Sequence, residues 1–242
     1  MSFMNLTYLG HACFLLETSK AKILFDPFIN PNSIVQEIRK STLDKTLVSK
    51  LSVDEIECDY VLISHGHEDH VADAESILQR TGAKVVSNFE IVSWFNEKGI
   101  SNNHPMNHGG SWEFDFGKIK YVSAVHSSVL PDGTYGGNPG GFIIQADGQT
   151  IYYAGDTALS YDMKLIGEEF NLDYAILPIG DNFTMGPEDA SKAAKFVGCN
   201  NVIAMHYDTF GYIKVDHDKV QQLFSKNGQS VTLMSIGETK EI

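Results

Sequence analysis

The stretch YVLISHGHEDHVAD (residues 60–73) runs from a short apolar segment into three closely spaced histidines. Its first five residues have the continuous apolar content of a buried strand, so the histidines follow the point where that strand ends. In an extended H-x-H segment, His65 and His67 point to the same side and can bind one metal ion. Asp69 and His70 follow where the chain turns into a helix, which is predicted to end at Gly82, and they can face a second ion. A solvated turn is the alternative, but H-x-H-x-D-H is a dense pattern for one.

Three later apolar runs end in the same kind of side chain. KIKYVSAV is followed by His126, QTIYYAG by Asp156, and NVIAM by His206. Each of these residues is a weak signal alone, because a lone histidine at a strand end is more often structural than a ligand. Together they predict a common rim of strand ends that holds a preorganised metal site. A carboxylate such as Asp156 can bridge two cations, and imidazole with carboxylate suits zinc, with manganese and iron left open.

Size and composition limit the class of protein. The chain has 242 residues, 43% of them hydrophobic, which predicts a single domain over residues 1–242. Its net charge of −13 argues against binding to phosphate backbones, so no nucleic-acid partner is expected. No apolar run approaches the ~18 residues that cross a bilayer, so no membrane partner is expected. Cys13, Cys58 and Cys199 form no C-x-x-C pair, and the odd number predicts a cytoplasmic protein without a disulfide framework.

The order of the expected elements indicates the fold class. NLTYLGHACFLLET and KILFDPF predict antiparallel strands, and ADGQ predicts the turn of a hairpin. Residues 30–59 are more polar and patchily helical, so they are interpreted as a helical insertion or lid. Helices and strands then alternate after residue 160. Two strand-rich blocks, each followed by alternating helices and strands, predict an α/β protein with a four-layer αββα sandwich.

SHGHEDH, with AVH, AGDT and AMH downstream, resembles the metallo-β-lactamase superfamily over almost the whole chain. YLGHACFLLET, FDPF, GGNPGGFII, PIGDNFTMGPEDA and MHYDTF are similar to a bacterial branch of metal-dependent hydrolases. That branch is similar to the ascorbate-phosphate lactonases and to the phospholipase D that cleaves N-acyl phosphatidylethanolamines. The resemblance implies a four-layer αββα sandwich of the metallo-β-lactamase type.

The resemblance also implies ligand roles for two divalent ions. The first ion would be held by His65, His67 and His126, the second by Asp69, His70 and His206, and Asp156 would bridge the two. The three cysteines lie outside these motifs, where a small buried packing role is expected. No cysteine stands at the ligand position used by some β-lactamases, so antibiotic hydrolysis is not implied.

Two adjacent ions would generate a bridging hydroxide that attacks an ester, lactone or phosphodiester bond of a small molecule. Asp69 would orient that hydroxide as well as bind metal. His11, in a GHA motif that the resemblance places near the metals, is interpreted either as a proton donor or metal-site contact or as a core histidine. Asp181 follows the apolar run AILPIG. It either orients a ligand histidine and shapes the pocket or fixes the loop before a helix at Pro187.

Two other functions remain open at this point. One is a metal-dependent oxidoreductase of the same fold, and the other is a metal-binding module without catalytic activity. The complete ligand set argues against the second of these. The sequence leaves the substrate and a homo-oligomeric state open.

Overall fold

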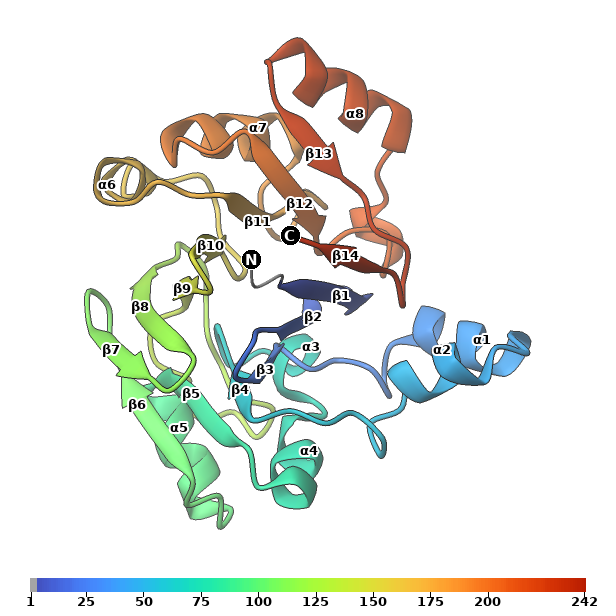
Figure 1. Cartoon of the computed structure of the whole chain (residues 1–242), viewed down its shortest axis with the longest axis vertical. Helices are drawn as coiled ribbons and strands as arrows, with labels where there is room; N and C mark the ends of the chain where they lie inside the picture. The colour runs from blue at the N-terminus through green and yellow to red at the C-terminus, as the bar shows by residue number, and fades with distance from the viewer. Residues whose placement is uncertain (1–3) are drawn as a thin grey trace. The chain divides into compact units, whose positions relative to one another are not determined.

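Two seven-stranded sheets contain all fourteen strands of residues 4–242, the part that this computed structural model describes (Figure 1). The first sheet lies in a unit made of Met1–Asn107, Ser128–Asn138 and Ser235–Ile242, and the second in a unit made of His108–Ser127 and Pro139–Met234. We call these the first and second units. The single domain over residues 1–242 stays a prediction.

The first unit combines antiparallel and parallel strand pairs. Its sheet has the order β14-β1-β2-β3-β4-β5-β6, in which β1, β2 and β3 pair antiparallel, as predicted, and β3 to β6 pair parallel. Strands β1, β3, β4 and β5 therefore run in one direction, and their carboxyl ends lie along one edge of the sheet. The elements are β1 (Asn5–Gly10), β2 (Cys13–Glu17), β3 (Lys22–Phe25), α1 (Ser33–Ser41), α2 (Lys45–Lys50), β4 (Tyr60–Leu62), α3 (Glu68–Val71), α4 (Ala74–Thr81), β5 (Lys84–Asn88), α5 (Phe89–Glu97), β6 (Asn103–Met106) and β14 (Thr239–Glu241).

Two of these strands have no counterpart in the predicted elements. Strand β6 contains Pro105 and lies at one edge of the sheet, where a residue without a backbone N–H is tolerated. Strand β14 is three residues long and pairs antiparallel with β1, so the first and last strands lie side by side (Figure 1). Both strands depend on pairing with distant parts of the chain, which a local pattern does not report.

The helix predicted from the histidine stretch is divided into α3 and α4 at Asp73. The Asp73 carboxylate accepts hydrogen bonds from the backbone N–H groups of Ile29 and Asn30, at 2.6 and 2.9 Å, and its own N–H donates to the carbonyl of Pro27. Burial raises the pKa of this carboxyl above its usual value. These contacts tie the start of α4 to the loop after β3. The predicted helix end at Gly82 is confirmed, with a left-handed φ of 68°.

Residues 30–59 contain the two helices α1 and α2. Asn32 and Asp44 cap their N-termini by accepting two backbone N–H groups each. The segment is therefore helical in part, as its patchy polarity indicated, and its function as a lid stays a prediction.

The second unit has a longer parallel section. Its sheet has the order β13-β12-β11-β10-β9-β8-β7, with β10 to β13 parallel and β9 antiparallel to both β8 and β10. Strands β8, β10, β11 and β12 thus end at one edge. The elements are β7 (Ser111–Phe114), β8 (Gly117–Ser123), β9 (Gly140–Ala146), β10 (Gln149–Tyr153), α6 (Met163–Glu169), β11 (Tyr174–Pro178), α7 (Pro187–Phe196), β12 (Asn201–Met205), the 3₁₀ turn η1 (Gly211–Ile213), α8 (His217–Lys226) and β13 (Ser230–Thr232).

The predicted hairpin at ADGQ is confirmed between β9 and β10. Asp147 and Gly148 form its two-residue turn with φ values of 50° and 82°, the positive values that a type I′ turn requires. In the same unit, α7 packs against both α6 and α8 (Figure 1). Gly167 in α6 permits the approach to α7, because a Cβ there would lie 2.4 Å from the carbonyl oxygen of Phe196.

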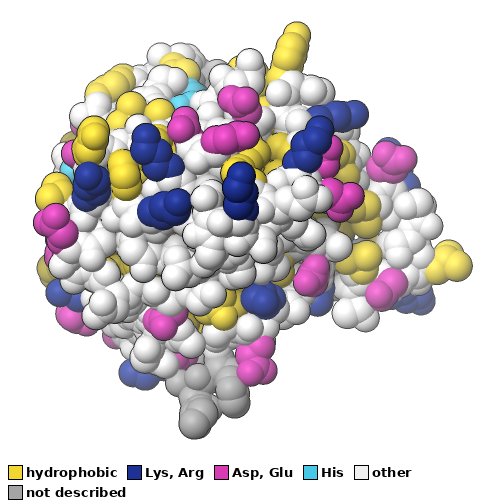
Figure 2. Space-filling view, turned by 90° about the horizontal axis from the view of Figure 1, so that it is seen from above, with side chains coloured by type: hydrophobic (Ala, Val, Ile, Leu, Met, Phe, Trp, Pro, Cys, Tyr) yellow, Lys and Arg dark blue, Asp and Glu magenta, His cyan; other side chains and the backbone are white. Residues whose placement is uncertain are grey.

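The three cysteines are free and buried, as expected of small packing residues. Burial raises the pKa of the Cys58 thiol to about 11 and also raises the pKa of Cys13 and Cys199. On the face drawn in Figure 2, acidic and basic side chains are interspersed among hydrophobic ones. Within residues 4–242, every helix falls short of the length and apolar content that crossing a membrane demands.

The variant Gly167→Ala tests the approach of α6 to α7. Alanine normally favours a helix over glycine, yet here its methyl group meets backbone atoms that cannot rotate away. We expect the free energy of unfolding to fall by about 1–3 kcal/mol in urea denaturation. The control Glu168→Ala, at an exposed neighbouring position, should change it by less than about 0.5 kcal/mol. A stabilised Gly167→Ala variant would contradict the close approach.

Candidate metal centre

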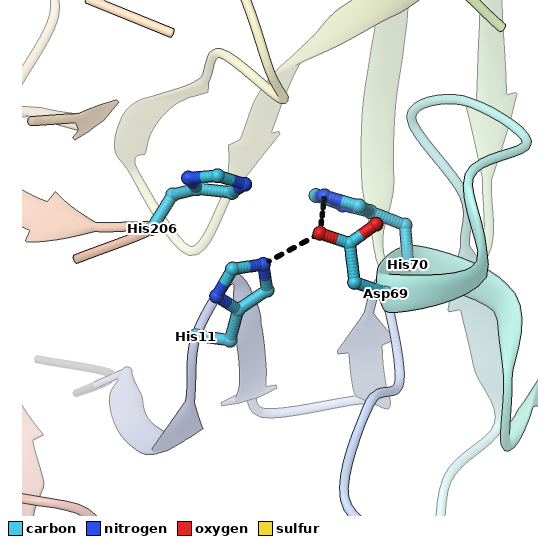
Figure 3. Close-up of side chains that lie close together, drawn as sticks. All are labelled: His11, Asp69, His70 and His206. Atoms are coloured by element: carbon cyan, nitrogen blue, oxygen red, sulfur yellow. Dashed lines mark hydrogen bonds and ion pairs between the residues drawn. The ribbon is translucent and has the colours of Figure 1, made fainter. Parts of the chain in front are cut away.

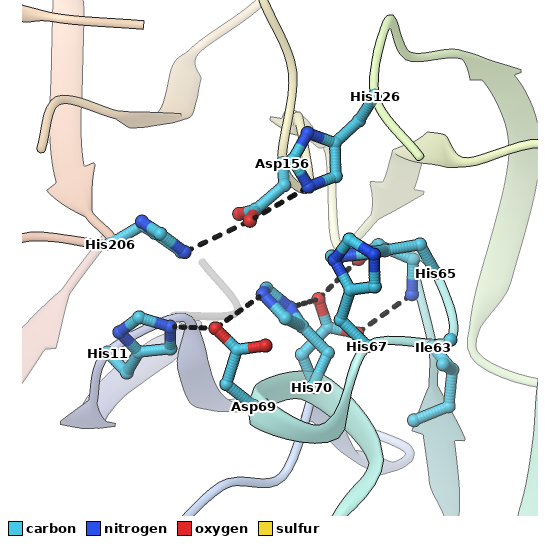
Figure 4. A network of polar contacts seen from close by, with 12 residues as sticks. His11, Ile63, His65, His67, Asp69, His70, His126, Asp156 and His206 are labelled. Carbon is cyan, nitrogen blue, oxygen red and sulfur yellow. Dashed lines mark hydrogen bonds and ion pairs between the residues drawn. The ribbon is translucent and has the colours of Figure 1, made fainter. Parts of the chain in front are cut away.

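Side chains able to bind metal gather at the carboxyl edge of the first sheet (Figure 4). His11 follows β1, Asp26 follows β3, and His65, His67 and His70 follow β4. Because β1, β3 and β4 run in the same direction, their ends meet at this edge. The strand order therefore brings together residues that lie up to 59 positions apart in the sequence.

The Asp26 carboxylate is the centre of a buried network. Asp26 is fully buried, and its Oδ2 lies 2.8 Å from His70 Nδ1 and 2.5 Å from Ser64 Oγ. Its Oδ1 accepts the backbone N–H of Ser64 at 2.8 Å. His65 Nδ1 lies 3.0 Å from Ser64 Oγ, which can accept from that nitrogen while donating to Asp26. The network therefore favours the tautomer with the proton on Nδ1 of both histidines, which leaves Nε2 of each as the ring nitrogen able to bind a metal ion.

The H-x-H pair has the geometry expected of two ligands to one ion. His65 Nε2 lies 2.9 Å from His67 Nδ1, and the two rings meet edge to face with their centroids 4.5 Å apart. Gly66 between them packs tightly, since a Cβ there would meet Leu130 at 3.1 Å. The N–H of Gly66 donates to Ser128 Oγ at 3.0 Å, and that hydroxyl donates in turn to the carbonyl of Gly136. The loop 128–138 thus supports the backbone between the two imidazoles.

Asp69 lies between two histidines of the first unit, His11 and His70. Its Oδ2 is 3.0 Å from His11 Nε2 and 3.8 Å from His70 Nε2, as Figure 3 shows. His11 is fully buried, whereas the Asp69 side chain keeps 26% of its surface exposed. His11 therefore contacts one of the predicted ligands, and its roles as proton donor, metal-site contact or core histidine stay predictions.

The second unit places three predicted ligands together at the carboxyl edge of its own sheet. His126 follows β8, Asp156 follows β10, and His206 follows β12. Asp156 is buried, and its Oδ2 lies 3.0 Å from His206 Nε2 and 3.6 Å from His126 Nε2 (Figure 4). One carboxylate oxygen thus stands between two imidazole nitrogens, which is the environment that a bridging ligand needs.

The residues that follow the strand ends have unusual backbone conformations. Positive φ is uncommon outside glycine and is tolerated best by Asn, Asp and His, and such strain collects at functional sites. Apart from Asp147 in the hairpin, every described non-glycine residue with positive φ follows β1, β3, β11 or β12. These residues are His11, Asp26, Asp181, Asn182, His206 and Asp208, with φ between 39° and 62°.

Asp181 has the contacts of a loop-fixing residue. It is exposed, its Oδ1 accepts the N–H of Asn182 at 2.8 Å, and its own N–H donates to the carbonyl of Met185. Its carboxyl group packs beside Gly186, the residue that precedes α7. These contacts hold the loop before Pro187, and both interpretations of Asp181 stay predictions.

The donor sets of both units fit divalent metal ions. Each contains at least two imidazoles and one carboxylate, with neighbouring donor atoms 2.9–3.8 Å apart. Imidazole with carboxylate is the donor combination that suits zinc, and it also accommodates manganese and iron. In the first unit, Asp26 contacts Nδ1 of His70 directly and reaches Nδ1 of His65 through the Ser64 hydroxyl, as ligand-orienting carboxylates do.

Comparison with known proteins identifies the family. A family model described as a β-lactamase superfamily domain matches residues 5–206. The chain belongs to the metallo-β-lactamase superfamily. A metal-dependent hydrolase of Christiangramia forsetii is 47% identical over 99% of this chain and 100% of its own length. The solved structure of Igni18, a metallo hydrolase from Ignicoccus hospitalis, is 37% identical with a TM-score of 0.83, covering 99% of this chain and 98% of that one.

A more distant structure supports the fold alone. YhfI from Bacillus subtilis has the metallo-β-lactamase fold and matches with a TM-score of 0.73 at 16% identity, over the full length of both chains. The predicted superfamily and its α/β fold class are therefore confirmed. Asp26 was not predicted as a site residue, although it stands in the FDPF motif of residues 25–28. Its signal was available, because Asp26 follows the apolar strand β3 as the predicted ligands follow theirs.

The variant Asp26→Asn tests the buried network. An amide would present a donor where the carboxylate accepts from His70 and Ser64, so both imidazoles should lose their fixed orientation. We expect affinity for zinc, measured by competition with a chromophoric chelator, to fall about 10- to 100-fold. Asp54→Asn makes the same change at an exposed position of the same unit and should leave the affinity unchanged. Equal affinities of the two variants would contradict the orienting function of Asp26.

Proposed function

We propose that this metal-dependent hydrolase uses two divalent ions, most simply zinc, to cleave an ester, lactone or phosphodiester bond of a small molecule. The observation that carries the proposal is the Asp156 carboxylate between two imidazoles, together with the histidine set of the first unit. As the sequence resemblance implies, His65, His67 and His126 would hold one ion, Asp69, His70 and His206 would hold the other, and Asp156 would serve both.

The comparisons support the reaction class. Both the relative from Christiangramia forsetii and Igni18 are described as hydrolases that depend on metal. At 47% and 37% identity over nearly the full chain, these proteins favour a hydrolase over the two alternatives, an oxidoreductase and a non-catalytic metal-binding module.

The residues of the chain have separate tasks in the proposed reaction. Two adjacent divalent ions, when bound, supply Lewis acidity and lower the pKa of water so that hydroxide forms near neutral pH. Asp69 orients the attacking oxygen through its carboxylate. His11, 3.0 Å from Asp69, holds that carboxylate and donates a proton to the leaving group. Asp26 keeps the imidazoles of His65 and His70 in a fixed orientation during these steps.

Replacement of the bridging carboxylate is the direct test. Asp156→Ala should remove the contact to both His126 and His206. We expect the metal content, measured by plasma emission spectrometry, to fall from close to two ions per chain to one or fewer. Hydrolysis of bis(4-nitrophenyl) phosphate should fall by at least about 10³-fold, because the arrangement of both ions depends on this side chain.

The matched control is Asp115→Ala, an exposed aspartate of the same unit, which should keep both metal content and turnover. Unchanged turnover in Asp156→Ala would refute the bridging function. Iron with redox activity in the purified protein would favour the oxidoreductase, and two bound ions without hydrolysis of any ester, lactone or phosphodiester would favour the non-catalytic module.

His11→Gln separates proton donation from a purely structural role. A glutamine amide can still hydrogen-bond to Asp69 but cannot transfer a proton. We expect kcat to fall about 10- to 100-fold with the metal content and thermal midpoint unchanged. If kcat and metal content both match the wild type, His11 serves only to hold Asp69 in place.

A further inference from the structure

We infer that three exposed aromatic side chains of the second unit form a subsite for an apolar group of the substrate, either an alkyl chain or an aryl ring. The residues are Phe183, Phe210 and Tyr212, which we call the aromatic cluster. The inference rests on the proposed hydrolase function, and it adds the chemical class of the group that flanks the scissile bond.

The exposure of these rings is the first observation. The exposed fractions are 51% for Phe183, 37% for Phe210 and 80% for Tyr212. The rings of Phe183 and Tyr212 meet edge to face with their centroids 6.3 Å apart, although they belong to different loops. Grouped and exposed apolar side chains mark binding surfaces more often than isolated ones do, because each ring left in water forfeits a large hydrophobic gain.

The loop of Phe183 is tied directly to the loop of Asp156. The N–H of Met185 donates to the carbonyl of Thr157 at 3.1 Å, and Thr157 is the residue after Asp156. Both Met185 and Thr157 are buried. Phe183 is therefore two residues from a rigid backbone contact with the loop that carries the proposed bridging ligand.

The loop that carries Phe210 and Tyr212 begins immediately after His206. Asp208 anchors it at three points. Its N–H donates to the carbonyl of Ile213 at 2.8 Å, its Oδ1 accepts the N–H of Val215 at 3.0 Å, and its Oδ2 lies 2.7 Å from His217 Nε2. The positive φ of Asp208 produces the sharp turn that these contacts hold. A subsite made of rings needs such a preformed backbone, because ordering a mobile loop would reduce the affinity.

The occupant that fits the cluster best is a part of the substrate. The three rings lie on the loops that follow β11 and β12, which leave the same sheet edge as Asp156 and His206. Three side chains are too few for a stable protein interface, which buries about 800 Å² on each partner. An alkyl chain or an aryl ring gains by leaving water at a patch of this kind, whereas a charged group would lose hydration.

The test compares ligands that share a metal-binding head and differ in apolar length. Hexylphosphonate and methylphosphonate are titrated calorimetrically into zinc-loaded protein, and zinc content and hydrolysis of bis(4-nitrophenyl) phosphate are measured on the same preparations. We expect the wild type to bind the hexyl compound at least about 10-fold more tightly than the methyl compound. The double variant Phe183→Ser with Tyr212→Ser should reduce this ratio to about 2, with unchanged zinc content and unchanged affinity for methylphosphonate.

Trp112→Ser is the matched control, since Trp112 is an aromatic residue of the same unit that is 54% exposed on the edge strand β7. It should keep the wild-type ratio. An equal ratio in the double variant and the wild type would refute the subsite while leaving the hydrolase function intact. Loss of a dimer in the double variant, seen by sedimentation, would also refute it, because the rings would then contact a second copy. Absence of bound zinc and of hydrolysis in the wild type would overturn the proposed function, and the subsite with it.

Discussion

The orientation of the His65 and His70 imidazoles depends on the buried carboxylate of Asp26. A buried carboxylate is costly unless it is fully hydrogen-bonded, and Asp26 accepts from the backbone and hydroxyl of Ser64 and contacts Nδ1 of His70. These bonds join the end of β3, the loop after β4 and helix α3. The same bonds determine which nitrogen of each imidazole faces outward, so protein stability and ligand orientation depend on one side chain.

Strand direction provides the rest of the arrangement. In each unit the strands that carry the candidate ligands are parallel to one another, although antiparallel strands lie between some of them. Their carboxyl ends therefore reach one edge, and the residues that follow must turn away sharply. Positive φ at His11, Asp26 and His206 is the local consequence of that turn. Tight backbone there leaves the side chains few alternative positions, which favours a preorganised metal site.

Sequence patterns within short windows predicted many of these strand ends and turns. The apolar runs before His65, His126, Asp156 and His206 indicated strand ends, and the two-residue hairpin and the cap at Gly82 followed from turn chemistry. Features that depend on distant partners were missed. Strand β14 forms by pairing with β1 at the other end of the sequence, and Asp73 divides a helix because it binds the backbone of Ile29 and Asn30.

The sequence by itself determined the family to which the chain belongs, and it predicted the candidate donor residues and that they follow strands. These are properties of residue type and spacing, which local periodicity records. Only the tertiary structure decided that Asp26 orients two imidazoles, that His11 contacts Asp69, and that Phe183 lies against Tyr212. Such contacts join residues that are 29 or more positions apart. Their existence depends on strand order and loop path, which no single stretch of the chain specifies.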